Sequence, residues 1–217
     1  MKFISYLLIL IALTLSIIEF IPTITWGYSH LSTYYWMLYG MGGYFLMHLI
    51  LFRRNIKWMQ TFAHELSHTL VSLMFLRKIH SFHVEEGTGA IVHSGRRRFG
   101  DIFISLAPYC LPYFTFLFIF LRIVGASNML YIFDLLIGFS FAFHLSCFWR
   151  QTGSYQTDIQ QHGLIRSYLF IAAALIFNTT IILLSIRLGI VKAVCYLMPQ
   201  YWHEILKAWD MILSLTK

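Results

Sequence analysis

Three ionisable side chains occur close together in residues 61–70, which read TFAHELSHTL. His64, Glu65 and His68 fit the pattern H-E-x-x-H. Residues four apart lie on one face of a helix, so both imidazoles can reach a single metal ion. A carboxylate next to the first histidine can take a proton from the attacking water. The alternative is a pair of histidines that form hydrogen bonds between helices. It is less favoured, because ionisable residues within an apolar span are costly and usually functional.

A catalytic zinc ion needs a third protein ligand and one open coordination position. We expect Asp158 to be this ligand, because it lies in the polar stretch RQTGSYQTDIQQHG, which can fold back beside the H-E-x-x-H segment. Asp134, in the apolar run YIFDLLIGF, is the main alternative, since a lone carboxylate within a span also needs a partner. That partner could instead be Arg122. The remaining candidates are His144 and His162.

The composition is typical of a membrane protein. Of the 217 residues, 59% are hydrophobic and only 12% are charged, whereas about a quarter of a soluble domain is charged. A transmembrane helix needs about 20 apolar residues. About six segments qualify, at residues 3–22, 32–52, 58–76, 102–124, 129–149 and 166–190. We therefore expect an all-α polytopic membrane protein in which residues 1–217 form a single integral membrane domain.

Two segments outside these spans have patterns of their own. Short β-prone runs at residues 79–84 and 90–93 flank the turn-forming sequence EEGTG, which predicts a β-hairpin over about residues 79–94. An extended substrate could add to either strand by main-chain hydrogen bonds. After Pro199, the sequence QYWHEILKAWDMILSL places its apolar residues on one face and most charges on the other. This pattern predicts an interfacial amphipathic helix at about residues 200–215.

With these motifs in place, residues 57–170 resemble the site-2 protease family of intramembrane zinc metalloproteases. The resemblance rests on an apolar H-E-x-x-H segment followed by a glycine-turned hairpin. The later Leu-Asp-Gly motif of the family is absent, and Thr157-Asp158 is closer to the Ser/Thr-Asp pair of its small, divergent bacterial branch. The resemblance implies one zinc ion bound by His64, His68 and Asp158, with Glu65 as the catalytic base. It also implies a transmembrane protein as substrate and a location in the bacterial inner membrane.

Two other functions stay open: a membrane protein that binds or transports a metal without proteolysis, and an inactive scaffold that binds membrane helices. Glu65 separates them from the protease, because water activation requires a carboxylate at this position and the other functions do not. The expected partners are the substrate and the lipid bilayer, with homo-oligomerisation left open. Nucleic acid is not expected, because the net charge of +7 comes mostly from loop Lys and Arg residues.

Overall fold

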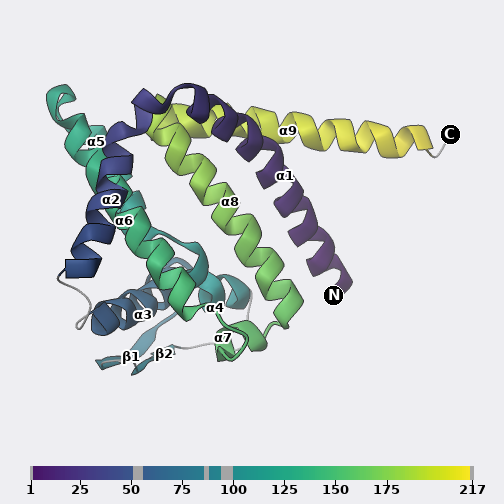
Figure 1. Ribbon diagram of the computed structural model, residues 1–217. Coiled ribbons are helices and arrows are strands. Elements are labelled where there is room, and N and C mark those ends of the chain that lie inside the picture. Colours follow the sequence, from purple (N-terminus) through teal and green to yellow (C-terminus); the bar gives the residue numbers. More distant parts are fainter. Residues whose placement is uncertain (1, 51–55, 86–87, 94–99, 216–217) are drawn as a thin grey trace.

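A computed structural model describes residues 2–50, 56–85, 88–93 and 100–215, and these form helices and one small hairpin (Figure 1). The elements in chain order are α1 (Lys2–Ser29), η1 (Leu31–Tyr34), α2 (Tyr35–Ile50), α3 (Ile56–Met74), β1 (Ile79–Glu85), β2 (Thr88–His93), α4 (Asp101–Cys110), α5 (Tyr113–Val124), η2 (Ser127–Met129), α6 (Leu130–Gln151), α7 (Thr157–Gln160), α8 (Leu164–Leu188) and α9 (Ile190–Leu215).

The predicted class of an all-α polytopic membrane protein is confirmed, but about six spans was too many. Among the described helices, three are long and apolar enough to cross a membrane, namely α1, α6 and α8. A fourth span exists if the bent pair α4 and α5 counts as one. Within the described residues, helix α2 has 16 residues, and a span needs about 20. Helix α3 is less apolar, because it carries the ionisable side chains of the H-E-x-x-H motif.

The segment predicted as one span at residues 102–124 is bent by 80° between α4 and α5. Pro112 lies at this break. Proline lacks a backbone N–H and disfavours helical geometry at the residue before it, so the first helix ends here. The side chain of Asn178 in α8 donates a hydrogen bond of 2.7 Å to the carbonyl of Cys110, which helps to satisfy the free end of α4. As a result, α4 packs on α3 while α5 packs on α6.

The C-terminal helix is present but starts earlier than predicted. Helix α9 begins at Ile190, directly after Gly189, whose φ of 81° is a left-handed conformation suited to glycine. Pro199 lies inside α9 and does not end it. Figure 1 shows the C-terminal part of α9 projecting away from the other helices. Trp202 and Trp209, in this part, are exposed.

The hairpin predicted after the H-E-x-x-H segment is confirmed. Strands β1 and β2 pair antiparallel, with Phe82 opposite Ile91 and Val84 opposite Gly89. Residues 86–87, at the predicted turn, and residue 94 lie outside the described part of the chain. Both strands pack on α3, so the hairpin covers the helix that carries the motif.

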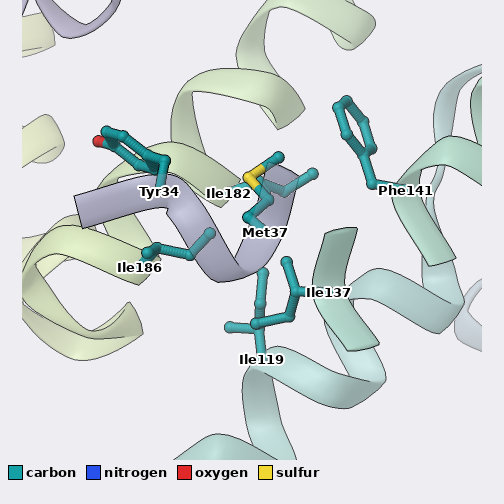
Figure 2. Close-up of a cluster of buried hydrophobic side chains, with 7 residues drawn as sticks. All are labelled: Tyr34, Met37, Ile119, Ile137, Phe141, Ile182 and Ile186. Carbon is teal, nitrogen blue, oxygen red and sulfur yellow. The ribbon is translucent and has the colours of Figure 1, made fainter. Parts of the chain in front are cut away.

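A buried apolar cluster joins η1, α2, α5, α6 and α8 at the end of the molecule away from the hairpin (Figures 1 and 2). Its members are Tyr34, Met37, Ile119, Ile137, Phe141, Ile182 and Ile186. Helices α2 and α6 approach so closely at Gly40 and Gly138 that a β-carbon at either position would overlap main-chain atoms of the facing helix. Lipid tails are as apolar as leucine, so helices in membranes associate largely through such close packing.

We predict that Gly40→Ala lowers the free energy of unfolding by about 1–3 kcal/mol, because the added methyl group overpacks the interface between α2 and α6. Gly42→Ala in the same helix is the matched control, since no atom lies within 4 Å of the position of its β-carbon. Thermal unfolding in detergent, followed by circular dichroism, measures both. Equal midpoints for the two variants would contradict the close packing described here.

Candidate metal centre

The two histidines of α3 point their Nε2 atoms toward each other. These atoms lie 3.2 Å apart, as the spacing of four residues on one helix allows. The Nδ1–H group of His68 donates a hydrogen bond of 2.8 Å to the carbonyl of Ile104 in α4. In the neutral ring, this bond places the proton on Nδ1 and leaves Nε2 of His68 free, which is how metal-binding histidines are commonly oriented.

The short helix α7 brings Asp158 to the same point. Its Oδ2 atom lies 3.4 Å from Nε2 of His64 and 3.4 Å from Nε2 of His68. The position of α7 is set by Ile159, which is fully buried against α4 and α8, and by the Ser167 hydroxyl, which donates a bond of 2.8 Å to the Ile159 carbonyl. The expected third ligand is therefore adjacent to both histidines, although it lies far along the chain.

The three donor atoms fit a zinc ion. In tetrahedral zinc sites with bonds of about 2.0–2.1 Å, neighbouring ligand atoms are about 3.4 Å apart. The separations here are 3.2, 3.4 and 3.4 Å. In the described part of the chain, His64, His68 and Asp158 are the one group of three possible ligands within reach of a single ion. Two neutral imidazoles and a carboxylate are a ligand type that leaves a fourth position open.

The Asp158 carboxyl group is held in its ionised form. Burial alone would raise the pKa of this group, but the adjacent rings of His64 and His68, whose charged forms attract the carboxylate, outweigh burial and hold the pKa well below its usual range. Tyr109 in α4 adds a long hydrogen bond of 3.5 Å from its hydroxyl to Oδ2. The ring of Tyr109 is fully buried and meets the ring of His64 edge to face at 5.5 Å.

Tyr109 was not predicted from the sequence. An aromatic residue in an apolar segment is ordinarily interpreted as part of the hydrophobic core. Its partner Asp158 lies 49 residues further along the chain, and the two side chains meet only in the fold. The Ile104 carbonyl was missed for a simpler reason, since a main-chain acceptor leaves no trace in residue type.

Glu65 lies at the wall of a cavity of about 1730 Å³ that is also lined by both histidines and Asp158. The side chain is largely buried, and strand β2 lies directly against it. A β-carbon at Gly89 would overlap the Glu65 carboxylate. Glycine at this position therefore permits the close approach of β2 to α3. The walls of this cavity therefore hold three possible metal ligands, the Glu65 carboxylate and strand β2.

The alternative third ligands do not belong to the group formed by His64, His68 and Asp158 among the described residues. Asp134 in α6 pairs with Arg122 in α5, with Nε 2.8 Å from Oδ1. The same guanidinium donates to the Ile186 carbonyl in α8 at 3.3 Å, so the pair ties three helices together. His162 lines the large cavity, where its Nδ1 lies 3.4 Å from the Arg166 guanidinium. His144 is buried in α6 behind His64.

An apolar helical protein with an H-E-x-x-H helix, a later aspartate beside both histidines and an adjoining cavity has the features of a membrane-embedded metallopeptidase. The comparison with protein families agrees, because residues 41–198 match the model of the Peptidase M50B-like family. This match covers most of the chain and all four site residues, so the chain belongs to this peptidase family, and the resemblance to site-2 proteases is confirmed. The comparisons with curated proteins and with solved structures returned no match.

We predict that Asp158→Ala reduces bound zinc from one ion per chain to nearly none, because it removes one of three protein ligands. Asp134→Asn is the control: it removes the charge of a buried carboxylate outside the ligand group and should retain zinc in the folded protein. Metal content of the purified variants, measured by mass spectrometry, distinguishes the two. Zinc lost only in Asp134→Asn would show that the assignment of the third ligand is wrong.

We predict that Gly89→Ala leaves zinc content unchanged but lowers peptide cleavage by about 100-fold, because the new methyl group displaces Glu65 from its working position. Ser81→Ala, which alters an exposed side chain of strand β1 outside the cavity, is the matched control. Turnover of a membrane substrate and zinc content are measured on the same preparations. Wild-type turnover in Gly89→Ala would contradict the contact between β2 and the Glu65 carboxylate.

Proposed function

We propose that the protein is an intramembrane zinc endopeptidase that hydrolyses peptide bonds in or near transmembrane segments of other membrane proteins. The observation that carries this proposal is the near-equilateral triangle of His64, His68 and Asp158 donor atoms, with Glu65 beside it. Membership of a peptidase family supports the reaction class, and the apolar helices support a substrate in the membrane.

The metal ion and the Glu65 carboxylate have separate roles in the proposed reaction. Zinc, when bound, acts as a Lewis acid that polarises the scissile carbonyl and makes a water molecule more acidic. Glu65 accepts the proton of the attacking water and then transfers it to the leaving amine. His68 stays in one orientation because the Ile104 carbonyl holds its other nitrogen. Burial of the site strengthens these electrostatic interactions.

Water has a polar route to the site. The segment between α6 and α8 contributes Gln156, Thr157 and Gln161 to the wall of the large cavity. Irregular backbone at membrane depth is tolerated where it is covered by protein or lines such a cavity. We propose that this segment, which also carries Asp158, admits the water that hydrolysis consumes.

Strand β2 offers a place for the substrate. Residues 89–92 line the cavity next to Glu65, and β2 pairs with β1 along its other edge. A substrate helix must unwind before it can be cut, and an extended peptide can add to a strand through main-chain hydrogen bonds. We propose that the unwound segment lies along β2, which brings its backbone to the base and the metal.

Two alternative functions were considered. The protein could bind or transport a metal in the membrane without hydrolysing peptides, or it could be an inactive scaffold. The position of Glu65 at the cavity wall, against β2, favours the peptidase, because neither alternative needs a buried carboxylate beside the ligands. We further propose a single catalytic membrane domain with its core at residues 57–170, located in the bacterial inner membrane by analogy with the family branch it resembles. Homo-oligomerisation stays open.

We predict that Glu65→Gln retains one zinc ion per chain and loses cleavage by a factor of about 10²–10⁴, the usual contribution of a general base. The amide keeps the size of the side chain but cannot accept the proton. Cleavage is measured with a reconstituted single-span substrate, and Lys57→Ala, a change of an exposed residue on the same helix, serves as the control. Full cleavage by Glu65→Gln would refute the peptidase mechanism.

A further inference from the structure

A second, much smaller cavity lies on the other side of His64, between α3, α5 and α6. Its volume is about 20 Å³, and its walls include His64, Tyr113 and His144. It is separate from the large cavity, with which it shares only the ring of His64. A cavity needs about 10–15 Å³ of such volume to hold one water molecule. This cavity is therefore of the size of a single water.

Three polar atoms of these side chains are buried and have no hydrogen-bond partner in the protein. They are Nδ1 of His64, the hydroxyl oxygen of Tyr113 and Nε2 of His144. Buried polar atoms are nearly always bonded either to protein or to ordered water. The two serines of the same cavity need no further partner, because the Ser67 hydroxyl donates to Ala63 and the Ser140 hydroxyl to Leu136, each at 2.8 Å.

We propose that one buried water binds His64, Tyr113 and His144, and that His144 positions the metal-binding ring of His64 through it. The water accepts a hydrogen bond from Nδ1–H of His64 and donates one to Nε2 of His144, and the Tyr113 hydroxyl completes its shell. Two to four polar partners are what a buried water requires. Each histidine of the metal centre would then donate a hydrogen bond from Nδ1, His68 to a main-chain carbonyl and His64 to a water molecule.

The function of this water follows from the tautomer it selects. A hydrogen bond from Nδ1 keeps the proton on that nitrogen and leaves Nε2 of His64 free for the metal. Without it, the ring can rotate or hold its proton on Nε2, and the metal site is then incomplete. His144, considered from the sequence as a third ligand, is in this account a positioning residue. This role rests on the proposed metal centre.

The test compares zinc affinity in purified, detergent-solubilised variants by competition with a chromogenic chelator. His144→Leu should weaken zinc binding about 10–100-fold, the usual effect of losing a hydrogen-bond partner of a ligand. His144→Gln, which can still bond to the water, should recover most of this loss. Cys147→Ala is the matched control, because Cys147 lines the same cavity and is equally buried but has no such role. Its affinity should equal that of the wild type.

Several results would overturn the proposal. Wild-type affinity in folded His144→Leu would do so, and so would an equal loss in Cys147→Ala, which would assign the effect to packing. If His144→Leu does not fold, Tyr113→Phe removes one oxygen atom from the same shell, and unchanged affinity there is equally decisive. Zinc binding without peptide cleavage would refute the proposed function and leave this role testable, whereas a wild-type protein that binds no zinc would refute both.

Discussion

The Asp158 carboxylate lies 3.4 Å from both His64 and His68 inside an apolar, helical protein. An ionised carboxylate is costly to bury unless donors or positive charge surround it. Neutral imidazoles meet this need only in part, and a divalent metal ion meets it fully while binding all three groups. The elements around the site serve to keep these atoms together: Tyr109 donates to Asp158, and the Ser167 hydroxyl holds the short helix that carries it.

The bend at Pro112 divides one apolar segment into two helices, α4 and α5, with different roles. Its first half, α4, turns toward α3 and supplies the Ile104 carbonyl and the Tyr109 hydroxyl to the site. Its second half, α5, stays with the helix bundle, where Arg122 pairs with Asp134. The close contact of α2 with α6, the apolar cluster in Figure 2 and this ion pair form a scaffold at one end of the molecule. The hairpin and the metal centre lie at the other end (Figure 1).

Local patterns in the sequence were enough to predict the histidine pair, because a spacing of four residues on a helix determines which side chains meet. The hairpin followed from glycine-rich turn chemistry, and Asp158 from the position of a carboxylate in a polar loop. The features missed depend on contacts between distant segments. The 80° bend and the start of α9 reflect how helices pack, whereas the number of spans fell because α2 is short and α3 is less apolar. The contact of Gly89 with Glu65 and the role of Tyr109 depend on which elements become neighbours.

The central claim is that His64, His68 and Asp158 bind one metal ion. Zinc X-ray absorption spectroscopy of the purified, metal-loaded protein tests it most directly, because it reports the ligand atoms themselves. The account predicts one zinc per chain, with two imidazole nitrogens and the remaining ligands oxygen, all at about 2.0–2.2 Å, and no sulfur. Sulfur at about 2.3 Å, or zinc with no imidazole, would contradict it, because the free cysteines Cys110, Cys147 and Cys195 lie outside the proposed site.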